Sequence, residues 1–215
     1  MPSLEFLNQL SALVALWVAI YGIDSWRREH TVKRQIELAE ESLALFYEAV
    51  DAVKYMRNPG SYSSETEDVL KDGSESDADY RARKQASIVF KRYRDNKELF
   101  SKLHAMRYRF MAQIGKDAAK PFDDLRAVVN EIQISASMLS RLWSRDYFRT
   151  PEQQESHRKQ ISENEAVFWE GLADRDPINP KLEELASRME QTCQKVIAGK
   201  GTVFAILNKR FGKRS

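Results

Sequence analysis

The sequence predicts an all-α membrane protein, with an N-terminal transmembrane helix followed by a bundle of four or five long helices. Three observations carry this prediction. Residues 10–23 contain no charged side chain. Further along the chain, large apolar residues recur three and four positions apart, which is the period of an amphipathic helix. No segment shows the alternation of apolar and polar residues that is typical of a half-buried strand.

The first predicted element is a membrane anchor over residues 1–23. With Leu4, Phe6 and Leu7, the uncharged stretch becomes a largely apolar segment of about 20 residues, which as a helix spans roughly 30 Å, the thickness of a bilayer's hydrocarbon core. The side chains expected to face lipid are Leu10, Leu13, Val14, Leu16, Trp17, Val18, Ile20, Tyr21 and Ile23.

Two other interpretations of this segment were weighed. A secretory signal needs a basic start and small residues at the cleavage site, whereas here Glu5 precedes the apolar stretch and the bulky Trp26 and Arg27 follow it. A buried core helix or an interfacial helix remains an alternative, because the fully uncharged stretch is shorter than a typical spanning segment.

The charges around the anchor predict its orientation. Arg27, Arg28, Lys33 and Arg34 follow it, and residues 1–9 contain no lysine or arginine. Basic residues are retained on the cytoplasmic side, so we expect the N-terminus to face outward and the body to lie in the cytoplasm. The single cysteine, Cys193, excludes an intramolecular disulfide and fits a reducing compartment.

Residues 24–198 are predicted to form the helical bundle. The first helix continues to Arg57 and ends at Asn58-Pro59, because proline disfavours the helical conformation in the residue before it. Residues 58–79 are rich in serine, glycine and acid, and we expect a mobile acidic loop with few contacts. Further helices are predicted over residues 79–114, 120–143, 150–172 and 179–198. Gly115, Pro121, Pro151 and Asn179 mark their boundaries.

A stripe of small and apolar residues predicts self-association. Small residues every four positions in a membrane helix let two helices approach closely, and the same phase continues into the first cytoplasmic helix. The predicted stripe comprises Ser11, Ala15, Ala19, Val32, Ile36, Leu43, Phe46 and Val50.

The helix predicted over residues 79–114 is basic and carries interleaved aromatic residues. Its candidate face for an anionic partner comprises Arg81, Arg83, Lys84, Lys91, Arg92, Arg94 and Lys97. Anionic lipid headgroups and nucleic acid are the partners that such a face fits, and a solvated helix surface is the alternative. Residues 199–215 form an apolar-basic tail, in which Phe204 and Phe211 accompany Lys209 and Arg210, and this composition fits either the membrane interface or docking on the bundle.

No constellation for catalysis or metal binding is recognised. The three histidines, His30, His104 and His157, are far apart in the sequence, and none has the spacing that places two ligands on one helical face. The nearest arrangement to a ribonuclease motif is Arg149 with His157, but Pro151 lies between them and the spacing departs from the four to six residues of the HEPN-type helical ribonucleases. We therefore expect no enzyme activity, no metal and no cofactor.

Three stretches carry a resemblance to known proteins: YGIDSWRRE (residues 21–29), ELAEESLALFYEA (37–49) and RYRFMAQIGKDAAKPFDDL (107–125). They resemble a group of uncharacterised bacterial membrane proteins with one N-terminal membrane segment and a helical body. The resemblance implies a bacterial cytoplasmic membrane and implies no activity. In layout the chain is also similar to CRISPR-linked membrane proteins whose HEPN-like bundles assemble into pores.

The function predicted from the sequence is a membrane-tethered helical interaction or scaffold module that associates with itself. The expected partners are the membrane, a second copy of the chain, and anionic headgroups or another protein. Two alternatives remain open at this point: an oligomeric pore-type effector, as found in bacterial defence systems, and a helical body that binds or cleaves nucleic acid.

Overall fold

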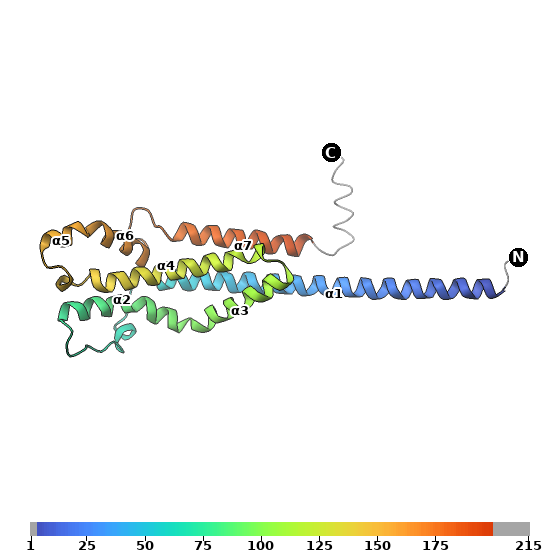
Figure 1. Cartoon of the computed structure of the whole chain (residues 1–215), viewed down its shortest axis with the longest axis horizontal. Helices are drawn as coiled ribbons and strands as arrows, with labels where there is room; N and C mark the ends of the chain where they lie inside the picture. Colours follow the sequence, from blue (N-terminus) through green and yellow to red (C-terminus); the bar gives the residue numbers. More distant parts are fainter. Residues whose placement is uncertain (1–3, 200–215) are drawn as a thin grey trace, which may run out of the picture. The chain divides into compact units, whose positions relative to one another are not determined.

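The structure, a computed structural model, describes residues 4–199, with side chains placed for residues 9–144 and 146–198. The helices in this part of the chain are α1 (Leu4–Met56), α2 (Asp77–Asp95), α3 (Lys97–Gln113), α4 (Lys120–Leu142), α5 (Pro151–Ser156), α6 (Arg158–Phe168) and α7 (Asn179–Gly199) (Figure 1). Three short 3-10 turns, η1 (Ser63–Thr66), η2 (Asp117–Ala119) and η3 (Arg145–Tyr147), complete the regular structure, and no strand occurs among these residues. The predicted all-α fold is confirmed.

The chain divides into two compact units. The larger unit comprises residues 42–192 and contains most of the bundle. The smaller unit comprises the residues before 42 and those from 193 onward. Helix α1 is continuous through residues 4–56, so the predicted anchor and the predicted first cytoplasmic helix are parts of one 53-residue helix.

In the larger unit, α4 packs extensively against α2 and α6. Figure 1 shows α4 returning alongside α2 and α3 after the turn at η2. Three aromatic rings join three helices in the core. The Phe122 ring meets the Phe46 ring edge-on, with centroids 5.8 Å apart, and lies 5.4 Å from the Phe110 ring. All three side chains are buried, as the helical periodicity predicts.

The predicted ends of α1, α3, α4 and α7 agree closely with the structure. Helix α1 ends at Met56, before Pro59. Gly115 follows α3 with a φ of +141°, a conformation that side chains with a Cβ rarely adopt, so glycine is required at this turn. Pro121 lies in the first turn of α4. There its missing N–H removes no helical hydrogen bond.

The helix predicted over residues 79–114 is wrong as a single element, because it divides at Asn96. The Asn96 side-chain amide donates to the Arg92 carbonyl oxygen at 2.9 Å, and its backbone N–H reaches the Tyr93 carbonyl at 3.2 Å, three residues back. The side chain thus competes for a carbonyl that a continuous helix would use. The result is two helices, α2 and α3, with Asn96 as the cap of both.

The helix predicted over residues 150–172 also divides. His157 separates α5 from α6, with its ring Nδ1 2.8 Å from the Gln153 carbonyl oxygen. Because a carbonyl oxygen only accepts, Nδ1 carries the proton in this contact. Helix α6 ends at Phe168, and Gly171 follows with a φ of 76°, so Leu172 lies outside the helix and is exposed rather than in the core.

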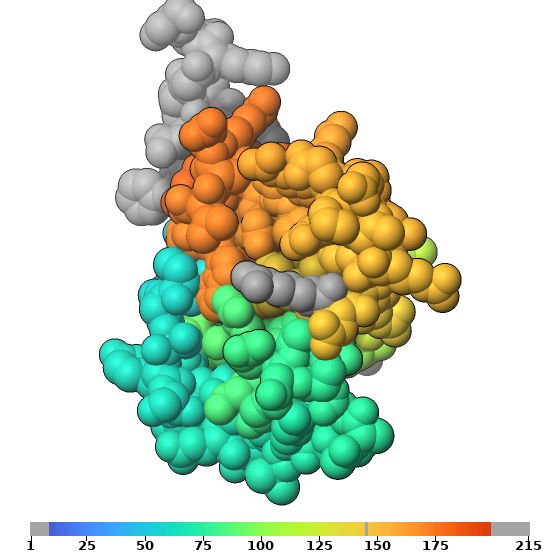
Figure 2. Space-filling view, turned by 90° about the vertical axis from the view of Figure 1, so that its left-hand side faces the viewer, coloured from blue at the N-terminus to red at the C-terminus, as the bar shows by residue number. Residues whose placement is uncertain are grey.

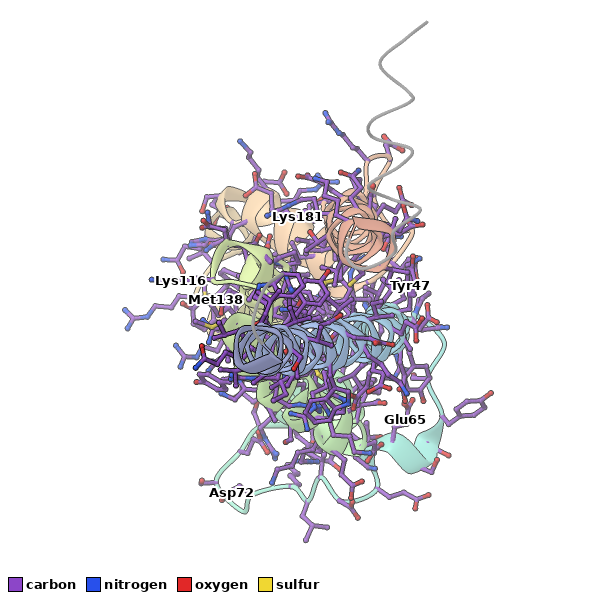
Figure 3. The ribbon with its side chains drawn as sticks, turned by 90° about the vertical axis from the view of Figure 1, so that its right-hand side faces the viewer. Tyr47, Glu65, Asp72, Lys116, Met138 and Lys181 are labelled. Carbon is purple, nitrogen blue, oxygen red and sulfur yellow. The ribbon has the colours of Figure 1, made fainter. Side chains whose placement is uncertain are left out.

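The acidic segment over residues 58–79 makes more contacts than the sequence predicts. The Glu65 carboxylate accepts hydrogen bonds from Arg92 at 2.7 and 3.0 Å. Tyr80 donates its hydroxyl proton to the Val69 carbonyl oxygen at 3.0 Å. Figure 3 labels Glu65 in η1 and Asp72 further along the same segment. The expectation of few contacts is therefore wrong, and deletion of the segment would remove the acid that pairs with Arg92.

The predicted self-association stripe needs a correction in its second half. Phe46 is fully buried and Val50 is nearly so, and both belong to the core of the larger unit. They cannot contact a second chain while the bundle is folded. Leu43, Ile36 and Val32 are partly exposed. The apolar-basic tail predicted over residues 199–215, with Phe204, Phe211, Lys209 and Arg210 among its members, lies outside the described residues except for Gly199.

Candidate functional site

The N-terminal part of α1 exposes its apolar side chains. All ten large hydrophobic residues between positions 10 and 26 are between 49% and 67% exposed. Of the helices in residues 4–199, α1 is the one long and apolar enough to cross a membrane, and none of its apolar window is buried. A core helix buries such side chains, whereas none of these ten is buried among the residues that the structure describes.

Aromatic and charged side chains follow the apolar stretch along α1. The Trp26 and His30 rings are stacked just after the apolar stretch, with centroids 5.5 Å apart. Trp17 and Tyr21, whose rings are stacked at 5.6 Å, lie within the stretch itself. Asp24 pairs with Arg28 at 2.8 Å, one helical turn away. Aromatic rings and arginines beside an apolar segment are the typical residues of a membrane–water interface.

Three of the seven bases in the face predicted on residues 81–97 form ion pairs within the chain. Arg92 is buried and holds Glu65. Arg83 forms two hydrogen bonds to Glu75, at 2.8 and 2.6 Å, and Lys91 pairs with Asp95 at 2.6 Å. The prediction that these bases face a partner is wrong for Arg92, because a buried guanidinium cannot reach one.

The remaining predicted bases lie nearer to solvent. Arg81, Arg94 and Lys97 are exposed. The Lys84 ammonium is half-buried and lies 5.7 Å from the centre of the Tyr80 ring. Among the residues that the structure describes, only four of the seven predicted bases are therefore not paired with an acid. A face with fewer unpaired positive charges binds anions more weakly than the sequence predicts.

Arg92, from α2, donates hydrogen bonds to backbone carbonyl oxygens at the C-terminal end of α1. The last carbonyls of a helix lack partners within the helix and must bond elsewhere. The Arg92 guanidinium donates to the Tyr55 carbonyl oxygen in the last turn of α1, at 3.1 Å. It also donates to the carbonyl oxygens of Asn58 and Gly60, just beyond the helix, at 2.6 and 2.5 Å. It also lies 5.0 Å from the centre of the Tyr55 ring. Hydrogen bonds from Arg92 are the main reason that the pKa of the Glu65 carboxyl lies below its ordinary value.

Arg57 performs a related role for the segment between α6 and α7. Its guanidinium is fully buried and donates to the Val167 carbonyl at 2.8 Å, to Asn179 at 3.1 Å and to the Asp176 carboxylate at 3.0 Å. The Arg57 carbonyl oxygen accepts from the Glu170 N–H at 2.8 Å. Burial alone would raise the pKa of Asp176, but hydrogen bonds from Arg57 and from backbone N–H groups outweigh it, and the pKa lies below its ordinary value.

The two buried arginines lie close together, because Arg92 donates to the carbonyl oxygens of Met56 and Asn58, the residues on either side of Arg57. Figure 2 views one end of the larger unit, where residues near 60–80 form one side and residues near 150–175 form the other. Neither arginine is predicted as a core residue from the sequence. A signal for them exists, because Arg57 follows Val53 by four positions and Arg92 follows Val89 by three, so each continues a buried stripe.

The Arg149 and His157 pair is not brought together by any hydrogen bond or ion pair within residues 9–144 and 146–198. The Arg149 backbone N–H donates to the Gln153 side chain, and His157 contacts the Gln153 carbonyl. The His157 ring lies 5.3 Å from that of Phe148. Over the part of the chain that the structure describes, no group of three or more His, Cys, Asp or Glu side chains has the arrangement of a metal site.

Comparisons of the chain with protein-family models, with curated proteins and with solved structures found no match.

Proposed function

We propose that the protein is a single-pass protein of a bacterial cytoplasmic membrane, whose helical body acts there as an interaction or scaffold module. The observation that supports this most directly is the exposure of all large apolar side chains between residues 10 and 26. In water each such side chain costs about 1.5–3 kcal/mol relative to burial, whereas a bilayer core buries them all at once.

The proposed topology has the N-terminus outside and the body in the cytoplasm. Its support is the charge difference across the apolar stretch, with Glu5 before it and Arg27, Arg28, Lys33 and Arg34 after it. Arg28 pairs with Asp24 and Lys33 pairs with Glu37, which leaves Arg27 and Arg34 as the stronger determinants.

Self-association is proposed to occur through the membrane segment. Ser11, Ala15 and Ala19 are exposed and share one side of α1, because they lie four residues apart. Small side chains at this spacing allow close backbone approach in lipid. Since Phe46 and Val50 are buried in the bundle, the contact between copies is confined to the part of the stripe before Phe46.

The membrane assignment is tested by charge substitution. In the double variant Leu13→Arg and Leu16→Arg each arginine costs about 2.5–3.5 kcal/mol at the centre of a spanning helix, so the protein should leave the carbonate-washed membrane fraction. The matched control is Leu13→Ile with Leu16→Ile, which should stay in the membrane. Recovery of the unchanged protein in the soluble fraction would overturn the proposal.

The topology is tested by reporters fused after Ser215. A reporter that is active only in the cytosol should be active, and one that is active only in the periplasm should be silent. The reverse result would place the body outside and would contradict the proposed orientation.

Self-association is tested by adding bulk to the stripe. Ala15→Leu with Ala19→Leu should reduce the oligomer measured in detergent, because leucine obstructs close approach without disfavouring insertion. Val14→Leu with Val18→Leu, which adds bulk about a quarter turn away, should leave the oligomer intact. An equal effect of both pairs would remove the stripe as the interface.

The same variants separate a scaffold from a pore-type effector. A scaffold should not admit a membrane-impermeant dye when it is overproduced. Dye entry with the unchanged protein, abolished by Ala15→Leu with Ala19→Leu, would replace the scaffold proposal with the pore.

A further inference from the structure

A groove of about 350 Å³ lies between α3 and α4 in the larger unit. Its location follows from the division of the long basic helix at Asn96. Helix α2 packs extensively against α4, whereas α3, which starts after Asn96, makes few contacts with α4. Figure 1 shows α3 and α4 as successive helices on either side of the turn at η2.

The floor of the groove is apolar, and aromatic rings lie beside it. Leu103 from α3 and Leu125 and Val129 from α4 are buried and line it. Tyr93 and Phe100 also line the groove, with their rings stacked 4.9 Å apart and inclined by 21°. Stacked rings of this kind offer an aromatic surface on which a planar ligand can pack.

The rim of the groove carries more positive than negative charge. Asp123 is the one acid among its lining residues, and Arg107 neutralises it, with Nε 2.7 Å from one carboxylate oxygen and Nη2 2.9 Å from the other. Arg126 also lines the groove, and it has no ion pair or hydrogen bond with any residue that the structure describes. His104 lies on the α3 side and Asn130 is one turn beyond Arg126 on α4.

We propose that this groove binds a small organic anion with a planar heteroaromatic ring, of the size of a nucleoside monophosphate. The ring packs beside Tyr93 and Phe100, and the anionic group is held by Arg126 with His104. The proposal does not rest on the membrane function, because every residue in it belongs to the larger unit.

Three features of the groove favour this class of ligand. Its volume falls in the range of small-molecule sites, about 300–1,000 Å³, and is too small for a folded partner. An apolar floor with a few polar groups at the rim is the usual composition of such a site. The guanidinium of Arg126 is a geometrically suitable donor pair for a phosphate or carboxylate.

The test measures binding of water-soluble probes to the purified full chain by titration calorimetry. AMP, GMP, CMP and UMP are compared with the matching nucleosides and with ribose 5-phosphate. These probes do not partition into detergent micelles, so heat arises from the protein. At least one monophosphate should bind, and its nucleoside and ribose 5-phosphate should each bind about tenfold or more weakly, because each lacks one of the two contacts.

Two variants locate the site. Arg126→Gln should weaken the monophosphate about tenfold or more while leaving the nucleoside unchanged, because it removes only the charged contact. Tyr93→Leu keeps apolar bulk in the groove and should weaken the monophosphate and the nucleoside alike. Both variants should retain the helical circular dichroism of the unchanged chain.

The control is Lys102→Gln, which removes one positive charge from α3 at an exposed position outside the groove. It should leave binding unchanged. The proposal is overturned if none of the four monophosphates binds, or if Lys102→Gln weakens binding as much as Arg126→Gln, since that would indicate attraction to the net charge of the protein rather than to the groove.

Discussion

Residues 10–26 and residues 42–56 belong to the same helix, α1, yet their apolar side chains have opposite environments. In the first stretch every large hydrophobic side chain is exposed, whereas in the second Phe46, Val50, Val53 and Met56 are buried. The second stretch has an apolar stripe with a polar opposite side, which suits a helix on a protein core. The first is apolar on all sides, which suits a helix surrounded by lipid.

A continuous helix can therefore lie in two different environments along its length. The backbone hydrogen bonds of α1 continue from Leu4 to Met56 through both stretches. What differs is how apolar residues are distributed around the helix, and therefore which surroundings can bury them. We therefore expect equivalent substitutions near the two stretches to have different effects on stability and reactivity.

The largest expected difference arises from truncating one apolar side chain in each stretch. Phe46→Ala should lower the free energy of unfolding of the bundle by about 3–5 kcal/mol, because it leaves a cavity in the aromatic core. Leu16→Ala should change it by less than about 0.5 kcal/mol, because Leu16 makes no core contact. Denaturant unfolding in a constant detergent, followed by circular dichroism, measures both. A comparable loss in the two variants would show that the first stretch packs within the fold.

The next difference concerns arginines. Arg92→Met should cost about 3 kcal/mol or more, because it leaves the Glu65 carboxylate and the carbonyls at the end of α1 without their donor. Arg28→Met, which breaks an exposed ion pair near the apolar stretch of α1, should cost less than about 1 kcal/mol. The same unfolding assay serves for both. Equal and small losses would mean that Arg92 does not hold the end of α1.

Acid sensitivity should also be localised in the larger unit. The pKa values of Glu65 and Asp176 lie below their ordinary values. Each carboxylate therefore contributes stability that is fully present above its unfolded-state pKa, near about 4, and that is lost as the pH falls through the lower folded-state pKa. Thermal unfolding between about pH 7 and pH 3 should show this loss.

The variant Glu65→Gln removes one of these titrations, so its stability should fall less steeply with acid than that of the unchanged protein. Asp24→Asn, which alters the exposed pair near the apolar stretch, should leave the slope unchanged. If Asp24→Asn flattened the profile and Glu65→Gln did not, the assignment of acid sensitivity to the bundle would be wrong.

The last difference concerns thiol labelling, which involves no loss of stability. Burial raises the pKa of Cys193 to about 11. At pH 8 only about one molecule in a thousand then carries the reactive thiolate, so Cys193 should react slowly with N-ethylmaleimide. A Ser25→Cys substitution in a Cys193→Ala background should react quickly in detergent, because residue 25 is exposed. Fast labelling of Cys193 in the unchanged protein would show that its site opens.

Much of the fold could be predicted from local signals in the sequence. Proline and glycine act on the backbone of their immediate neighbours, so Pro59, Gly115 and Pro121 mark helix ends wherever the rest of the chain lies. The breaks at Asn96 and His157 were missed, because each depends on a side chain that bonds to a carbonyl four residues earlier, and the same residues also occur within helices.

The candidate sites were harder to predict, because charge in a sequence does not reveal burial. Seven bases between residues 81 and 97 indicate a basic surface, but Arg92 is buried and Arg83 is paired with Glu75. Only tertiary structure shows these pairings, since the arginine and its acid are separated along the chain. The groove between α3 and α4 was missed for a related reason, because it exists only through the division at Asn96.

The end of α1 has a consequence for the timing of synthesis. Arg92 follows Gly60 by 32 residues, whereas Asp176 follows Arg57 by 119 residues. At about 5–20 residues per second, a ribosome adds Arg92 within roughly 2–6 s of Gly60 but reaches Asp176 only about 6–24 s after Arg57. The carbonyls held by Arg92 therefore gain their donor early, while the Arg57 guanidinium stays in water until nearly the whole bundle has emerged. In a nascent chain stalled before residue 166, Arg92 could already bond to the carbonyls at the end of α1, whereas Arg57 would still lack its partners.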